Sequence, residues 1–365
     1  MTNVAWGPGR RDTAISGLAA LLNRPEWRDS DHCPAIARVV SAALHDANPV
    51  VRMQAAYAAR AVHADADAAH RAAAVGELLL AERDTNVRMV LLDQLAADSA
   101  AAPATVDAIL ERLVDGDPDR QVAGILTYLA LVPRTPFASR LIERWCADAS
   151  AHPQAVQSFV QHARSYLRPP ADAGQIRAFR LLDTTAHAVL AQWTRYAGEH
   201  RAEVLSDDQL AELRGAAGTA DDIAQQIYFA SGAFDDKRGR QGPSGDDLTG
   251  FADLAFPVLA KCAALRHPHS IHQAVETMIF LAPVDEARAL HGVAEAIPAD
   301  GPYASESLAG DLVIPYLQRL LAEQRPLVLH DERGVASFRH LLATFAVAGN
   351  QAALTLAYTF ADVFR

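Results

Sequence analysis

The sequence contains few of the residues on which many catalytic and metal sites depend. Its only cysteines, Cys33, Cys146 and Cys262, are far apart and form no CxxC pair, so we expect neither a zinc ribbon nor a thioredoxin-like centre. An odd number of cysteines without a pattern is typical of the reducing cytosol, and we therefore expect a cytoplasmic protein. Its only lysines are Lys237 and Lys261, which leaves almost no candidate for a lysine nucleophile or for the lysine of a phosphate-binding loop.

Long apolar runs and a positive charge balance are also missing. No stretch of about 18 apolar residues occurs without a charge, and the N-terminus has no continuous apolar segment of the secretory kind, so we expect no membrane span and no signal peptide. The formal net charge is -11. Because nucleic-acid binding depends on clustered lysine and arginine, this balance argues against a nucleic-acid partner.

Alanine and leucine, by contrast, are abundant. Hydrophobic residues make up 50% of the 365 residues and charged residues 21%, a balance typical of a folded protein rather than a disordered one. Alanine has the highest helix propensity, and β-branched runs in this chain are short. The composition favours close-packed helices, and the length favours several domains or one elongated repeat array.

An internal repeat is the clearest pattern in the sequence. The tripeptide Val-Arg-Met occurs at 51–53 and again at 87–89, which is 36 residues later, and two further turns carry Pro118 and Pro153, 35 residues apart. These turns place capping residues or proline directly before an amphipathic segment, as at the N-terminus of a helix. A period of this length indicates a helical solenoid, because such helix pairs bury their apolar faces only against neighbouring pairs.

The predicted fold is all-α, an α-α superhelix of antiparallel helix pairs. Four helical hairpins are expected in the first half, at 34–64, 67–99, 104–133 and 136–167. Longer helices are expected at about 175–205 and 206–231. The C-terminal part is expected to contain helices near 248–265, one ending at about 281, and others near 284–297, 305–323, 332–348 and 351–364.

The domain organisation follows from the same patterns. Residues 235–247 contain no large apolar residue, so we expect a mobile surface loop there. The expected segments are an N-terminal cap or ragged first repeat at 1–33, N-terminal repeats at 34–168, longer irregular helices at 169–234, the flexible loop at 235–247 and C-terminal repeats at 248–365.

The turns follow the pattern D-x-x-[PN]-x-V-R before an alanine-rich helix, and in this they resemble HEAT repeats. The resemblance covers 34–167 well and 248–365 loosely, and it implies a HEAT-like α-solenoid. It also implies a ladder of aspartate and arginine side chains between adjacent repeats. The ladder positions in this chain would be Asp46, Arg52, Asp84, Arg88, Asp117 and Arg120. The third turn departs from the pattern, because Arg120 stands two residues before Val122.

The C-terminal segment, from 306–311 through 361–365, resembles the end of the helical-repeat region in large bacterial ATP-binding proteins. Some of those proteins act in signalling or phage defence through a sensor array of repeats. The resemblance implies a bacterial protein whose ligand is a foreign protein or a partner subunit, with the ATPase part outside this chain.

No motif of a catalytic, nucleotide or metal site occurs in the chain. There is no GxxxxGK[ST], no GxGxxG after a strand, no HExxH and no GxSxG. The densest histidine cluster, His267, His269 and His272, lies at an expected repeat turn, where a structural or surface role is favoured over metal binding. Adjacent acids such as Asp221 and Asp222 point about 100° apart on a helix and so do not form a catalytic dyad. We expect no catalytic residue, no metal and no cofactor.

These patterns favour a non-catalytic scaffold or recognition module that binds a protein partner. A curved solenoid exposes a long surface built from the second helix of each pair. The positions expected to face the partner, by helical phase or by their place in the 235–247 loop, are Gln54, Arg60, Asp93, Gln94, Thr127, Gln157, Gln161, Lys237, Arg238 and Arg240.

Two alternatives stay open. A HEAT-like enzyme, such as a DNA base glycosylase or a lyase, would need an acid in an aromatic-lined cleft, for which Trp145 and Trp193 are candidates. A strongly raised pKa of an acid beside them would favour this enzyme. A nucleic-acid-binding solenoid would need a local basic patch, for which the N-terminal arginines, such as Arg10 and Arg11, are candidates.

Overall fold

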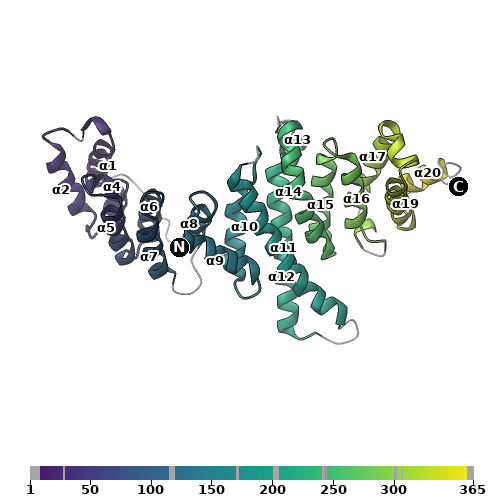
Figure 1. The fold of residues 1–365 in the computed structure, drawn as a ribbon, viewed down its shortest axis with the longest axis horizontal. Helices are drawn as coiled ribbons and strands as arrows, with labels where there is room; N and C mark the ends of the chain where they lie inside the picture. The colour runs from purple at the N-terminus through teal and green to yellow at the C-terminus, as the bar shows by residue number, and fades with distance from the viewer. Residues whose placement is uncertain are drawn as a thin grey trace. The chain divides into compact units, whose positions relative to one another are not determined.

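All regular structure in the described part of the chain is helical. The computed structural model describes residues 9–27, 29–114, 120–169, 172–199, 205–240, 243, 245–299, 302–305 and 307–359. These residues contain α-helices and two 3-10 turns and no strand, which confirms the all-α prediction (Figure 1). Among the described helices, none has both the length and the apolar character that a membrane crossing requires.

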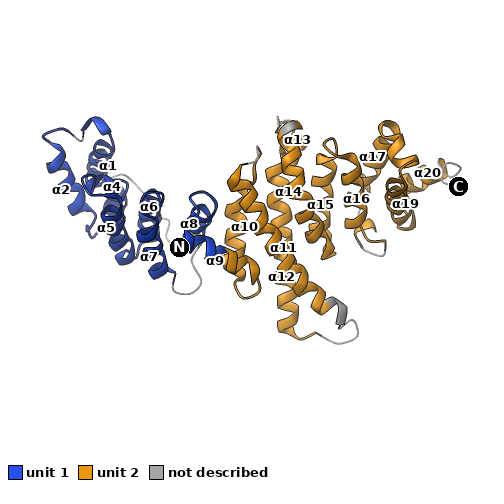
Figure 2. Ribbon diagram, viewed as in Figure 1, with its two compact units in different colours: residues 1–142 blue, residues 143–365 orange. Residues whose placement is uncertain are grey.

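The chain divides into two compact units, unit 1 at residues 1–142 and unit 2 at residues 143–365 (Figure 2). The helices of unit 1 are α1 (Arg10–Leu22), α2 (Cys33–Ala43), α3 (Pro49–Ala56), α4 (Ala59–Val62), α5 (Ala68–Ala81), α6 (Thr85–Ala96), α7 (Pro103–Leu113) and α8 (Arg120–Leu131). The division falls inside α9 (Pro136–Ala147). The first three predicted hairpins correspond to α2–α3, α5–α6 and α7–α8.

Unit 2 begins within α9 and continues with longer helices. Its helices are α10 (Pro153–Leu167), α11 (Ala173–Glu199), α12 (Asp207–Ser231), α13 (Ala233–Lys237), α14 (Gly245–Ala264), α15 (Pro268–Leu281), α16 (Glu286–Ala296), α17 (Ser307–Glu323), α18 (Arg325–Leu329), α19 (Glu332–Val347) and α20 (Gln351–Thr359). Helix α10, which precedes the expected segment boundary at 168, packs against α11 and α12.

Each unit is built from two layers of helices. In unit 1, α1, α3, α6 and α8 contact one another in this order, and α5 packs against α7 in the other layer, while α4 bridges α2 and α5. In unit 2 one layer runs α10, α12, α15, α17 and α20, and the other runs α11, α14, α16 and α19. Within a layer, each helix therefore packs against the one two or three places along the chain, which is the arrangement of a solenoid of helix pairs.

The helices begin where short polar side chains cap them. Asn48 accepts a hydrogen bond from the Val50 amide before α3, and Asp84 accepts bonds from two amides at the start of α6. Ser206 forms a capping box with Gln209 at α12. Each cap satisfies amides that have no partner within the helix, which is why the repeat turns could be located in the sequence.

Small and apolar side chains form the core of each unit. The predicted stripe of α6 is buried, since Val87, Val90, Leu91 and Leu95 are each at most 4% exposed. The helices α5 and α7 approach so closely that a Cβ on Gly76 would stand 2.4 Å from Ile109. This tight packing uses the abundant alanine and glycine.

The loop expected at 235–247 is helical at both ends, which corrects that prediction. Gly232 has φ +95°, a left-handed conformation that glycine adopts readily, and it ends α12. A new helix, α13, then begins at Ala233 with Asp235 and Asp236 in its first turn, where the helix dipole favours negative charge. Helix α14 starts at Gly245, within the expected loop.

Candidate functional site

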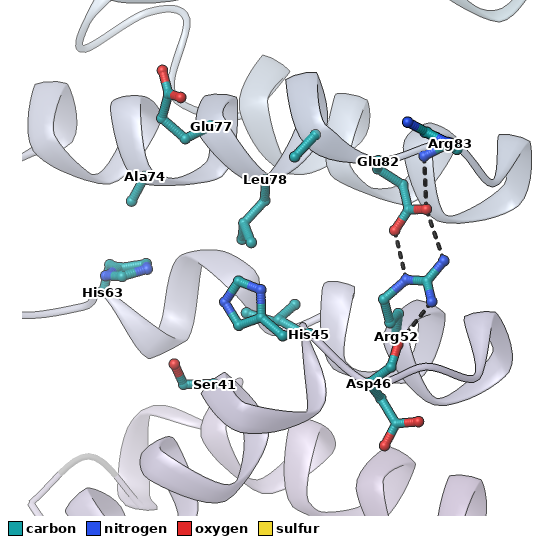
Figure 3. A pocket seen from close by; sticks show the side chains of 12 residues that line it. Ser41, His45, Asp46, Arg52, His63, Ala74, Glu77, Leu78, Glu82 and Arg83 are labelled. Atoms are coloured by element: carbon teal, nitrogen blue, oxygen red, sulfur yellow. Dashed lines mark hydrogen bonds and ion pairs between the residues drawn. The ribbon is translucent and has the colours of Figure 1, made fainter.

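A cavity of about 560 Å³ lies in unit 1 between α2 and α5 (Figure 3). We call it the α2–α5 cavity. Helix α2 and the turn after it contribute one wall, α5 contributes the opposite wall, and α3 and the end of α4 close the space between them. Its lining residues are Ser41, Leu44, His45, Asp46, Arg52, His63, Ala74, Glu77, Leu78, Ala81, Glu82 and Arg83.

A two-pronged ion pair closes one end of the cavity. The Arg52 guanidinium donates to both oxygens of Glu82, at 2.7 and 2.8 Å, and also to the backbone carbonyls of Asp46 and Ala47 (Figure 3). Glu82 in turn accepts hydrogen bonds from the amides of Arg83 and Asp84, both at 2.8 Å. These contacts, chiefly the bond from Arg52, lower the pKa of Glu82 to about 2.

The other two carboxylates around the cavity are also paired. Glu77 accepts a bond from Arg112 of α7 at 2.8 Å, and Asp46 pairs with Arg11 of α1. The carboxylates that line the cavity are therefore already neutralised by arginines from neighbouring helices. A bound ligand would instead meet the uncharged polar side chains and the exposed guanidinium of Arg83, which has no ion pair among the described residues.

Three polar side chains of the lining have no hydrogen-bond partner among the described residues. They are the hydroxyl of Ser41 on α2, the imidazole of His45 directly after α2, and the imidazole of His63 at the end of α4. Figure 3 shows both imidazoles directed into the space between α2 and α5, with Leu78 above His45. Polar groups that lack a protein partner and line an open cavity are available to a ligand.

The α2–α5 cavity was not predicted from the sequence. His45 and His63 stand 18 residues apart in the first hairpin, at no spacing that marks a site, and the opposite wall comes from the next hairpin. A lone histidine near the end of a helix carries no signal of its own. Only the stacking of α5 against α2 and α4 gives these residues a common cavity.

At one position of the predicted aspartate–arginine ladder, Arg52, the structure shows a different acceptor. Arg52 contacts the next hairpin, but its acceptor is Glu82, while Asp84 caps α6. Arg88 is half-buried on α6. Asp117 and the side chain of Arg120 lie outside the described residues.

Surface ion pairs instead connect successive helices of one layer. In each pair the acid lies on the earlier helix and the arginine on the later one. The pairs are Glu77–Arg112, Glu143–Arg180, Asp253–Arg288 and Glu295–Arg333, at 2.6 to 3.2 Å. Exposed pairs of this kind contribute about 0–1 kcal/mol each, so they set the register of neighbouring helices more than their stability.

The glutamines and the acid expected on the second helices are solvent-accessible. Gln54, Gln94 and Gln161 are half-buried, and Asp93 and Gln157 are exposed. Gln157 donates to Asp222 at 3.4 Å.

Two other candidates from the same helices are engaged within unit 1. Thr127 is fully buried and donates to the Ala123 carbonyl, so its expected exposure was wrong. Helix α8 buries residues around most of its circumference, and helical phase therefore did not identify a solvent side. Arg60 holds the buried Asp98, which Arg71 also contacts.

The basic residues expected in the loop each have a partner within unit 2. Lys237 donates to Glu276 at 2.9 Å, and Arg240 lies 3.8 Å from Asp235. The Arg238 guanidinium stacks 4.2 Å from the centre of the Phe234 ring. The charges of these three residues are therefore partly balanced locally.

The histidine cluster does not converge on a common centre. His267 contacts Asp221 at 3.0 Å, whereas His272 contacts Tyr303 at 3.1 Å and Glu276 at 3.6 Å. Within the described residues no group of three or more His, Cys, Asp or Glu side chains could hold a metal ion.

The tryptophans considered for an aromatic cleft differ in exposure. Trp145 is 2% exposed and belongs to the core, whereas Trp193 is half-buried on α11. Two acids have a raised pKa, the exposed Asp93 through partial desolvation by its neighbours and Asp222 through partial desolvation and the charge of Asp221. Neither acid is among the residues that line the α2–α5 cavity.

Comparisons with known proteins give no family assignment. No protein-family model matches the sequence, and no curated protein sequence matches it. Among solved structures, the crystal structure of an engineered protein is 16% identical with a TM-score of 0.25. The match covers 97% of this chain and 92% of the engineered chain. A structure from a study of a phosphorylation switch that controls the interaction between cadherin and β-catenin is 14% identical with a TM-score of 0.28. The match covers 97% of this chain and 96% of the chain in that structure. TM-scores this low do not establish a shared fold.

Proposed function

We propose that the protein is a non-catalytic recognition module that binds a protein partner and that the α2–α5 cavity receives part of this partner. The observation that carries the proposal is the set of unpartnered polar side chains, Ser41, His45 and His63, in a cavity of about 560 Å³. A volume between about 300 and 1,000 Å³ is typical of ligand sites. Stacked helix pairs also provide long surfaces for macromolecules, so a side chain inserted in the cavity can continue into wider contacts.

The lining favours binding over catalysis. A general base needs a partner that orients its imidazole, and a serine nucleophile needs a base within hydrogen-bond distance. Neither His45 nor His63 has a carboxylate partner among the described residues, and Ser41 has no hydrogen-bonded base there. Glu82, the acid at the closed end of the cavity, is kept ionised by Arg52. Both of its carboxylate oxygens already accept hydrogen bonds.

The resemblance of the C-terminal segment to repeat regions of bacterial ATP-binding proteins suggests where the partner is found. We infer that it is a component of a cytoplasmic signalling or phage-defence system, either a foreign protein or a subunit of the same assembly. The HEAT-like character of the turns is part of the same proposal, since HEAT-type arrays present their surfaces to proteins.

Photo-crosslinking in the source organism tests the proposal. A photoreactive phenylalanine analogue at Leu78, which lines the cavity, should capture one recurrent protein, with or without phage challenge. The same analogue at Leu354, an exposed leucine of unit 2, is the matched control. Capture of the same proteins at both positions, or of nucleic acid, would contradict the proposal.

Cavity-filling variants give a second, independent readout. Ala74 lines the cavity, and its neighbour Ala73 is exposed on the same helix. Ala74→Phe should abolish capture at Leu78, because the added ring occupies the space of the ligand, whereas Ala73→Phe should leave capture unchanged. Equal capture in both variants would show that the partner does not enter the cavity.

A further inference from the structure

The polar lining of the α2–α5 cavity indicates the chemical class of the group that enters it. Its unpartnered side chains, Ser41, His45 and His63, supply one hydroxyl and two imidazole rings from α2, the turn after it and the end of α4. Each can donate a hydrogen bond to a group that enters the cavity. Several donors directed at one space suit a ligand group that accepts several hydrogen bonds.

Each carboxylate that lines the cavity is paired with an arginine, so the lining side chains without a partner are positive or neutral. Arg11 of α1 neutralises Asp46, Arg52 of α3 neutralises Glu82, and Arg112 of α7 pairs with Glu77 of α5. Arg83, at the start of the α5–α6 turn, is exposed and forms no ion pair within the described residues. The titratable groups without a partner are therefore all bases, which favours an anionic ligand.

We propose that the α2–α5 cavity binds a carboxylate of the partner protein, held by Ser41, His45 and His63. The inference depends on the proposed recognition function and specifies the group that is recognised. A carboxylate accepts hydrogen bonds from hydroxyl and imidazole donors of this kind, and Arg83, the lining guanidinium without an ion pair among the described residues, adds to the attraction for an anion. The paired acids Asp46, Glu77 and Glu82 along the wall would also repel a dianion more than a monoanion.

The proposed contact makes binding depend on pH. An anion beside an imidazole favours its protonated form, so the complex takes up protons on forming. Affinity therefore increases as the pH falls from 8 to 6 and decreases as it rises. Glu82 stays ionised over this range because its pKa is lowered to about 2, chiefly by the hydrogen bond from Arg52, and histidine variants assign the change to the imidazoles.

Fluorescence anisotropy with defined peptides tests the inference on the full chain. The probe is a labelled nine-residue amidated peptide with a central glutamate between leucines, compared with the same peptide carrying glutamine. At pH 6 the glutamate peptide should bind about tenfold more tightly, as expected for charge-assisted hydrogen bonds. At pH 8 this ratio should be smaller.

Histidine variants assign the effect to the cavity. The double variant His45→Gln/His63→Gln should remove most of the tenfold preference and its pH dependence. His70→Gln is the matched control, because His70 is an exposed histidine of α5 that pairs with Asp67 and does not line the cavity. Circular dichroism of each variant verifies that it is folded. An unchanged preference in the double variant would overturn the assignment.

Further peptides distinguish the source of the carboxylate. The glutamine peptide with a free C-terminal carboxylate tests a chain terminus, and binding of either carboxylate peptide supports the inference. Equal binding of the glutamate and glutamine peptides, binding only of a phosphoserine peptide, or no binding would overturn it. In all three cases a partner still captured at Leu78 and lost in Ala74→Phe would leave the recognition function standing, so the two failures are distinguishable.

Discussion

Replacing Glu82 by glutamine removes the carboxylate that closes one end of the α2–α5 cavity. In the folded protein the pKa of Glu82 is lowered from 4.5 to about 2, chiefly by its hydrogen bond from Arg52. The carboxylate is 8% exposed and its arginine partner 19%, so solvent screens the pair only in part. A pKa difference of this size corresponds to about 3 kcal/mol of unfolding free energy at neutral pH.

The sign of the pH dependence follows from the lowered pKa. The stabilisation is fully present above pH 4.5, where the carboxylate is ionised in both the folded and the unfolded chain, and it is lost as the pH falls toward 2. The difference between wild type and Glu82→Gln should therefore be about 3 kcal/mol at pH 7 and only about 1 kcal/mol at pH 3.

Urea unfolding followed by circular dichroism at pH 7, 5 and 3 measures this difference. The matched control is Glu77→Gln, which removes another acid of the same cavity wall. Glu77 and its partner Arg112 are 70% and 60% exposed, so this variant should lose no more than about 0.5 kcal/mol. If Glu82→Gln loses as little as Glu77→Gln, or loses as much at pH 3 as at pH 7, the assignment of the lowered pKa to Arg52 is refuted.

Two further predictions concern packing and thiol reactivity. Gly76→Ala should destabilise unit 1 by about 1–3 kcal/mol in thermal unfolding, because its Cβ would meet Ile109 at 2.4 Å. By contrast, Gly215→Ala should stabilise α12 by up to about 1 kcal/mol, since nothing lies within 4 Å of the new Cβ and alanine favours the helix. Burial raises the pKa of the Cys262 thiol to about 12, so in alkylation at pH 8 the partly exposed Cys33 should react while Cys262 stays unmodified until the chain unfolds. Equal labelling of the two cysteines in the folded protein would contradict the buried placement of Cys262.

The functional proposals rest on one feature of unit 1, the contrast between paired and unpaired polar groups. The carboxylates around the cavity are fixed by arginines from neighbouring helices, as in the Arg52–Glu82 pair. Ser41, His45 and His63 have no such partner among the described residues. Because the paired side chains of the wall are already fixed, fewer side chains lose conformational freedom when a ligand binds to the unpartnered donors. This favours recognition of a specific group.

The sequence alone determined the helices and their order, because the signals involved are local. Capping residues such as Asn48 and Asp84 mark helix starts through contacts within three residues, and the apolar stripe of α6 follows from helical spacing. The same local rules did not identify the short helix α13, whose polar composition resembles that of a loop.

Only the tertiary structure decided which residues share a site. His45, His63 and Leu78 line one cavity because α4 packs against both α2 and α5, and no spacing in the sequence encodes that arrangement. Thr127 appeared exposed by helical phase, yet α8 is packed around most of its circumference and buries it. Helical periodicity fixes the direction of a side chain relative to its own helix, whereas burial and cavities depend on how neighbouring helices pack against it.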